Sequence, residues 1–178
     1  MLVEVECMKK ILVSILCLLL VCGCQSNRID INEERAQVYA SYITAIQDNE
    51  NFLEESSYFS IHTAMNKIGE NEYRWDVIID NPLIAMYEIQ ILAVERNVIG
   101  TLRDDKIMPS VGILEEEVYN MIPNQVNLEK GYVEGFTLSG ITELPEITIE
   151  VLVVWTGYAK LAQNREYFYL EAKYEESN

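Results

Sequence analysis

Apolar and polar residues alternate along most of the chain beyond position 57, and a period of two predicts β-strands. The clearest run is 147–155, where apolar residues also occupy some positions of the opposite face, which predicts burial on both faces for part of its length. Similar alternation covers 59–65, 73–79, 86–94, 132–139 and 165–174, with Phe168, Leu170 and Ala172 pointing inward in the last run. Glycine-, asparagine- or proline-containing turns at 69–72 and at 81–82 separate neighbouring runs.

One segment before these runs has a helical period instead. Residues 33 to about 49 place apolar side chains on one stripe, and Phe52 and Leu53 could extend the helix to about 55. Asp30 or Asn32 could cap it, and the acidic residues at its start favour a helix N-terminus. We expect the stripe, Tyr39, Tyr42, Ile43 and Ile46, to pack on the domain; the alternative is a free partner-binding helix.

The segment 95–130 is less regular. Short strands are predicted around 98–102 and 118–122, with a charged turn at 103–106 between them. Short strands separated by frequent turns favour an all-β sandwich. We therefore predict one globular domain over 33–178, an immunoglobulin-like antiparallel β-sandwich of about seven strands preceded by one α-helix. The Cys…Trp…Cys signature of true immunoglobulin domains is absent, and no internal repeat is found.

The N-terminal segment has the features of an export signal. Met8-Lys9-Lys10 is a basic start, residues 11–22 are apolar apart from Ser14, and polarity rises sharply after position 24. These features predict a secretory signal peptide, because the apolar run is too short to cross a bilayer. Glu4 and Glu6 would be misplaced in such a leader, so we expect translation to start at Met8.

The end of this leader, Val21-Cys22-Gly23-Cys24, resembles the lipobox of bacterial prolipoproteins. The resemblance implies cleavage between Gly23 and Cys24, a diacylglyceryl lipid on Cys24, and attachment at the extracytoplasmic face of the bacterial cell membrane. Residues 1–23 would then be removed and 24–32 would form a lipidated tether. Cys22 departs from the more usual alanine or serine. With its 73–82 segment, the layout also resembles small uncharacterised lipoproteins of Gram-positive bacteria, which implies no activity.

Cysteine content and charge limit the possible functions. The four cysteines, at 7, 17, 22 and 24, all lie at or before the lipidation site, so a mature chain would have no disulfide and no catalytic thiol. From residue 24 onward there are 11 basic and 27 acidic residues, giving 11 − 27 = −16. This charge argues against nucleic acid and anionic headgroups as partners. It favours solubility near a negative surface, or else a basic partner or a divalent cation.

Few residues suggest catalysis. His62 is the single histidine of the chain, and the lack of further histidines disfavours a zinc site. Any Ser-His-Asp triad would have to use His62. No cofactor or metal site is predicted. Asp76 and Asp80 would share one strand face and could form a carboxylate pair, although we expect a solvated face there. Calcium at Asp80-Asn81 or Asp104-Asp105 lacks the EF-hand pattern.

The 11 tyrosines of the chain are a stronger indication of a function than these polar residues, because exposed tyrosines often contact ligands. Tyr167, Tyr169 and Tyr174 lie near a sheet surface and could contact a protein or sugar, or could simply pack at a sheet edge. We therefore expect a membrane-anchored, non-enzymatic interaction module whose partner is an envelope or extracellular protein. The alternatives are a carboxylate-dependent hydrolase acting on cell-wall glycan and a small accessory binding subunit of an envelope transporter.

Overall fold

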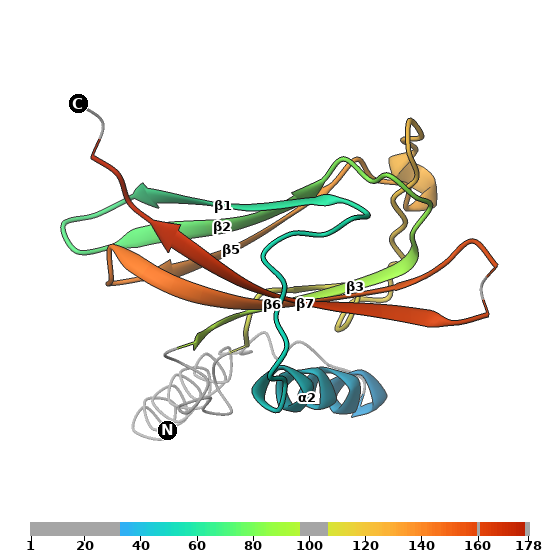
Figure 1. Cartoon of the computed structure of the whole chain (residues 1–178), viewed down its shortest axis with the longest axis horizontal. Helices are drawn as coiled ribbons and strands as arrows, with labels where there is room; N and C mark the ends of the chain where they lie inside the picture. Colours follow the sequence, from blue (N-terminus) through green and yellow to red (C-terminus); the bar gives the residue numbers. More distant parts are fainter. Residues whose placement is uncertain (1–32, 97–106, 160, 177–178) are drawn as a thin grey trace, which may run out of the picture. The chain divides into compact units, whose positions relative to one another are not determined.

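The structure is a computed structural model that describes residues 33–96, 107–159 and 161–176 (Figure 1). Within these residues there are one α-helix, one short 3-10 helix and seven β-strands. In chain order they are α2 (Glu33–Gln47), β1 (Ser60–Lys67), β2 (Tyr73–Asp80), β3 (Tyr87–Glu95), β4 (Ser110–Val111), η2 (Leu128–Lys130), β5 (Phe136–Thr142), β6 (Glu146–Thr156) and β7 (Gln163–Lys173).

The strands form two antiparallel sheets, ordered β1-β2-β5 and β4-β3-β6-β7. The first, second and fifth strands thus face the third, sixth and seventh, and the short fourth strand joins the edge of the second sheet. This is the strand distribution of an immunoglobulin-like sandwich. The predicted fold class, an all-β sandwich of about seven strands with one N-terminal helix, is confirmed.

The alternating side chains build the core between the sheets. On β6 the odd-numbered residues Ile149, Val151 and Val153 are fully buried in this core, together with inward-facing side chains of β2 and β7. The inward residues predicted for the last strand, Phe168, Leu170 and Ala172, belong to the same cluster. Burial of these side chains supplies the main driving force for joining the two sheets.

A second cluster lies on the outer face of the β4-β3-β6-β7 sheet, where α2 packs (Figure 1). Leu152 and Val154 of β6 contact this cluster, and Tyr42 and Ile46 of α2 are buried in it. The Tyr42 hydroxyl donates a hydrogen bond of 2.6 Å to Gln90 Oε1 on β3. The prediction that the helical stripe packs on the domain is therefore confirmed, and α2 is the reason that β6 is buried on both faces.

Several predicted boundaries are wrong. The helix ends at Gln47, because Phe52 and Leu53 run beside β7: the Leu53 N–H bonds the Tyr167 carbonyl at 2.8 Å, and the Tyr169 N–H bonds the Leu53 carbonyl at 3.1 Å. The strand predicted at 132–139 begins only at Phe136 and continues to Thr142. Pairing of Leu53 with the exposed edge of β7 stabilises the fold more than a longer helix would.

The irregular segment also differs in part from its prediction. The fourth strand is Ser110–Val111, while residues 120–122 form isolated bridges, including one between Met86 and Met121. Other predictions lie outside the described residues, namely the strand at 98–102, the pair Asp104-Asp105, the caps Asp30 and Asn32, and the leader with Gly23 and Cys24. None of the helices in the described ranges has the length and apolarity that a membrane crossing requires.

Candidate functional site

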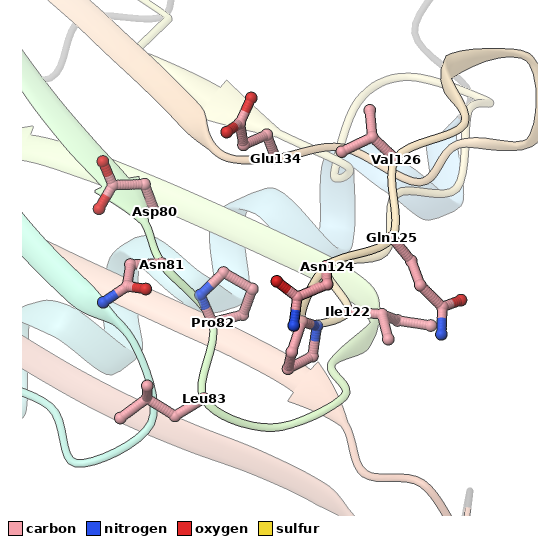
Figure 2. A pocket seen from close by; sticks show the side chains of 10 residues that line it. Asp80, Asn81, Pro82, Leu83, Ile122, Asn124, Gln125, Val126 and Glu134 are labelled. Atoms are coloured by element: carbon pink, nitrogen blue, oxygen red, sulfur yellow. The ribbon is translucent and has the colours of Figure 1, made fainter.

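A pocket of about 530 Å³ opens at the end of the sandwich where β2 finishes and β5 begins (Figure 2). We call it the end pocket. Three stretches of chain line it, namely the β2–β3 connection at 80–83, the loop at 122–126 and Glu134. In Figure 2 the β2–β3 connection faces the 122–126 loop across the opening, and Glu134 lies on the same rim as Asp80. Segments distant in sequence therefore meet around one hollow.

The β2–β3 connection is shaped by Asn81-Pro82. Asn81 adopts φ 49, in the left-handed region, where asparagine is tolerated better than most residues. Its side-chain amide reaches Ser60 Oγ at 3.4 Å. The chain then turns so that the Leu83 N–H bonds the Tyr58 carbonyl at 2.7 Å. This backbone path ends β2 abruptly and leaves Asp80 at the rim of the end pocket.

The opposite wall is a tight turn. Ile122 accepts a hydrogen bond of 3.1 Å from the Gln125 N–H, with Pro123 and Asn124 as the central residues. Asn124 has φ 60, and proline followed by a residue of positive φ is the pattern of a type II turn. The turn presents the side-chain amides of Asn124 and Gln125 to the end pocket.

Glycine at position 135 brings the third wall into place. A Cβ on Gly135 would lie 2.6 Å from the carbonyl oxygen of Ile79, so any other side chain would push β5 away from β2 at this point. The close approach lets Phe136 begin the pairing of β5 with Ile79. Glu134 consequently sits beside the end of β2, next to Asp80.

The end pocket carries uncompensated negative charge. Asp80 is half-buried and Glu134 is exposed, and no ion pair of either carboxylate is recorded among the described residues. Lys130 lies nearby in an adjoining hollow of about 460 Å³ that shares Asn124, Gln125 and Val126 with the end pocket.

The remaining lining gives the end pocket a mixed character. Pro82, Leu83, Ile122 and Val126 supply apolar surface, and the amides of Asn81, Asn124 and Gln125 can both donate and accept hydrogen bonds. Apolar walls with a few convergent polar groups are typical of ligand sites. Two carboxylates among such walls suit a ligand with a cationic group attached to an apolar body.

The predicted pair Asp76 and Asp80 does not act together. Arg74 Nη2 contacts Asp76 Oδ1 at 2.8 Å, and the Ser139 hydroxyl donates to the same oxygen. The side chain of Asp76 is only about 10% exposed, so the expectation of a solvated face is wrong for this residue. The arginine and serine compensate its charge, and Asp80 instead shares the end pocket with Glu134.

His62 is exposed on β1 and lines a different hollow, of about 690 Å³, between β1, β7 and the Leu53 segment. The described contacts of Ser139 and Asp76 do not include a histidine. Within the described ranges there is also no group of three or more histidine, cysteine or acidic side chains that could hold a metal ion.

The three tyrosines singled out as surface contacts have neighbours inside the domain. Tyr167 packs against the helix cluster, and Phe52 meets it edge-on with ring centroids 6.5 Å apart. Tyr169 also contacts Phe52, and the Arg96 guanidinium lies 5.1 Å from its ring centroid. Tyr174 packs against the main core and the Tyr73 ring, at 5.5 Å. Of the three, Tyr169 retains the most free surface, at 36%.

Sequence reasoning missed the residues of the 122–126 loop and Glu134. The Pro123-Asn124 pair is a turn signal that could have placed this loop. Its proximity to Asp80, however, depends on non-local pairing, namely the bridge between Met86 and Met121 and the approach of Gly135 to β2.

Comparison with known proteins adds little about activity. A family model described as a domain of unknown function (DUF272), C-terminal, matches residues 24–79, which include α2, β1 and β2 as far as Ile79. None of the curated proteins matches the sequence. A solved structure described as the X-ray structure of Northeast Structural Genomics Consortium target SoR45 is similar at 11% identity and a TM-score of 0.38, over 71% of this chain and 96% of that one.

Proposed function

We propose that this protein is a membrane-anchored, non-enzymatic binding module of a bacterial envelope that holds a basic segment of a partner in the end pocket. The observation that carries the proposal is the placement of Asp80 and Glu134 on one rim of a pocket with amide and apolar walls. Within the described residues, neither carboxylate forms an ion pair. A lysine or arginine of the partner would supply the missing positive charge.

The charge of the whole chain supports the same partner class. A formal net charge of −16 attracts basic segments over distances of about a Debye length, which increases their rate of encounter. The amides of Asn124 and Gln125 would then hydrogen-bond the backbone of an extended segment, and Leu83 and Val126 would contact its apolar side chains. We expect the partner to be another envelope or extracellular protein.

The anchoring part of the proposal rests on the leader and the lipobox resemblance at Cys24. A diacylglyceryl group supplies two acyl chains, which is the number that stable anchoring generally requires. An accessory subunit of an envelope transporter would be one form of such a module, with the transporter as its partner.

Hydrolysis of cell-wall glycan is the second candidate, because Asp80 and Glu134 place two carboxylates in one pocket. A carboxyl group that acts as a general acid is usually kept protonated by apolar enclosure. Glu134 is exposed and Asp80 only half-buried, so this enclosure is lacking. Release of reducing sugars from purified peptidoglycan, abolished by Asp80→Asn, would favour this candidate over binding.

Calorimetric titration of the purified protein with a short peptide containing lysine, arginine and leucine tests the binding proposal. We expect measurable binding that weakens with added salt. The double variant Asp80→Asn/Glu134→Gln should bind roughly tenfold or more weakly, because the loss of even one charge-assisted hydrogen bond of about 1.5 kcal/mol corresponds to a factor of about ten.

The matched control is Glu70→Gln/Glu143→Gln, which removes the same charge from exposed residues of the turns at the other end of the sandwich. Equal weakening by both double variants would show that only the net charge matters, and would contradict a site at the end pocket.

A further inference from the structure

A second hollow lies between β5 and the last residue of β3. We call it the side slot, and its volume is about 280 Å³. Both sheets and the stretch before β4 line it, with Trp75, Glu95, Ile107, Met108, Gly140 and Ile141 among the lining residues. It shares no lining residue with the end pocket, which opens where β5 begins, whereas Gly140 and Ile141 lie near the end of β5. The side slot is therefore a separate site.

The stretch before β4 is fixed in place by backbone hydrogen bonds. The Ala93 N–H donates to the Pro109 carbonyl at 3.0 Å, which holds this stretch beside β3. The Met108 N–H donates to the Tyr39 hydroxyl of α2 at 2.7 Å. This wall of the side slot thus has a defined position relative to both β3 and α2.

Glu95 is a buried acid on the inner face of β3. Ile91 and Ala93 belong to the core between the sheets, and the strand period of two places Glu95 on the same face. The Thr142 hydroxyl of β5, in the opposite sheet, donates to Glu95 Oε1 at 3.2 Å, in agreement with this placement. Glu95 is 7% exposed. Acidic side chains are rarely buried without a partner, because removing a carboxylate from water costs free energy.

Glu95 differs in its partners from the buried acids Asp76 and Glu150. Each of those two contacts an arginine, at 2.8 Å and 3.2 Å. Within the described residues Glu95 forms no ion pair, and its carboxylate accepts a hydrogen bond from Thr142. A carboxylate has about four positions at which it can accept hydrogen bonds. Glu95 can therefore accept more of them, and its charge favours a cationic donor.

Trp75 contributes a donor to the same slot. It is 2% exposed, and within the described residues no acceptor reaches its indole Nε1–H. The N–H edge of the ring lies against Gly140, since a Cβ on that glycine would be 2.8 Å from Trp75 Nε1. Both residues line the side slot. Because buried donors nearly always have an acceptor, the indole indicates a ligand that brings an acceptor atom to this point.

The other side chains of the side slot are mainly apolar. Met108 is buried, and Ile107 and Ile141 line the slot while remaining 50% and 62% exposed. These side chains suit the apolar body of a ligand. A cavity of about 150 Å³ can hold benzene, so the side slot has room for one ring and a short chain.

We propose that the side slot binds a small, free organic amine that also carries an acceptor oxygen. Its ammonium group contacts Glu95, its oxygen accepts the indole N–H of Trp75, and its apolar body lies against Met108 and the two isoleucines. Such a ligand compensates the charge and pairs the donor at the same time. The site goes beyond the proposed function, and it depends neither on the end pocket nor on a lipid at Cys24.

NMR of the purified, nitrogen-15-labelled full chain tests the site. The chain has two tryptophans, so its spectrum contains two indole N–H signals, which the variant Trp155→Phe assigns. Trp155 also has a buried indole N–H without an acceptor in the described residues, but it does not line the side slot. We expect 2-phenoxyethylamine to shift the Trp75 signal saturably and to leave the Trp155 signal in place.

Two isosteric probes separate the contacts. 3-Phenylpropylamine replaces the ether oxygen by a methylene group, so it should bind severalfold more weakly and cause no downfield shift of the Trp75 indole proton. 2-Phenoxyethanol replaces the ammonium group by a hydroxyl group and should bind about tenfold more weakly, as expected for the loss of a charge-assisted hydrogen bond.

Glu95→Gln should remove the preference for 2-phenoxyethylamine over 2-phenoxyethanol. The matched control is Glu150→Gln, which removes a buried carboxyl group from the helix-facing side of the same sheet and should keep that preference. If Glu95→Gln does not fold, the three probes on the wild type decide the question without it.

Three results would overturn the inference. The first is a Trp75 signal that none of the probes shifts, and the second is an equal shift of both indole signals. The third is equal affinity of the wild type for the amine and the alcohol. Tighter binding of an acetylated lysine amide than of 2-phenoxyethylamine would contradict a free small molecule as the ligand, and would assign the side slot to a lysine side chain of a partner.

Discussion

The pairing of Trp75 with Gly140 shows how one residue fits another across two strands. The two are register partners on β2 and β5, and a Cβ on Gly140 would overlap the indole ring of Trp75. Trp75 is fully buried in the core between the sheets. The absent side chain of glycine therefore provides the volume that the indole occupies.

Gly140→Ala should destabilise the fold by about 1–3 kcal/mol, because the added methyl group overpacks a filled core. Urea unfolding followed by tryptophan fluorescence measures this loss. Gly157→Ala is the control, since its Cβ would meet no atom closer than 3.5 Å; it should change stability by no more than about 1 kcal/mol. An equal loss in both variants would contradict the role assigned to Gly140.

Glu150 is a buried carboxylate on the helix-facing side of β6. It is 5% exposed, and its Oε1 lies 3.2 Å from Arg96 Nη1. Burial raises the pKa of Glu150 above its ordinary value of 4.5, and the Arg96 guanidinium, which lowers the pKa, offsets only part of this effect. The folded state therefore holds the proton of Glu150 more tightly than the unfolded state does.

A raised pKa in the folded state means that stability is fully present below pH 4.5 and falls as the pH rises through the folded-state pKa. Glu150→Gln removes this fall, so the variant should gain stability relative to the wild type between pH 4 and pH 7. Unfolding curves at both pH values measure the gain. Glu146→Gln, an exposed change on the same strand, should show no such trend; a parallel trend would refute the assignment to Glu150.

At the scale of elements, α2 is attached to the sandwich by a few buried contacts. Ile46 is 1% exposed and Tyr42 is 5% exposed, whereas most of the helix faces solvent.

Ile46→Ala should lower the free energy of unfolding by about 2–5 kcal/mol, as expected for a core residue that leaves a cavity. Denaturant unfolding gives the loss, and hydrogen exchange should show faster opening of α2. Thr44→Ala, on the exposed side, should be nearly neutral, and an Ile46→Ala variant as stable as Thr44→Ala would show that the helix is not docked.

The sequence was most informative where side chains alternate over a long run. On β6 the inward and outward residues were predicted correctly, because each face is buried by a different neighbour, one sheet and one helix. Prediction failed at Leu53 and at Ser110–Val111, where only one or two residues pair with a strand edge. Pairing of so few residues leaves no periodic pattern in the sequence.

The candidate site was less predictable than the fold. The sequence indicates Asp80 as a site residue, but its expected partner Asp76 instead contacts Arg74 and Ser139, and the contact with Ser139 depends on the pairing of β2 with β5. Glu134 is brought to Asp80 by the close approach of Gly135, which also depends on that pairing. Local sequence shows which residues are acidic, whereas the tertiary fold decides which of them share a pocket.

At the scale of the whole molecule, the net charge limits how the protein could be attached to a membrane. The net charge of −16 lies entirely after position 23. A protein of this charge is repelled by an anionic bilayer, so its attachment should depend on the lipid. The lipobox resemblance makes Cys24 the lipid-bearing residue at the cleavage site, so Cys24→Ala should yield an unprocessed precursor without lipid, and labelling of this variant by radioactive fatty acid would contradict the proposal.

The most direct test of the anchored module is the intact mass and N-terminal residue of the wild-type protein extracted from bacterial membranes with detergent. We predict a chain that begins at Cys24 and carries the added mass of a diacylglyceryl group on that residue. A chain that begins at Met1 or Met8, or one that begins at position 24 without added lipid, would contradict the account.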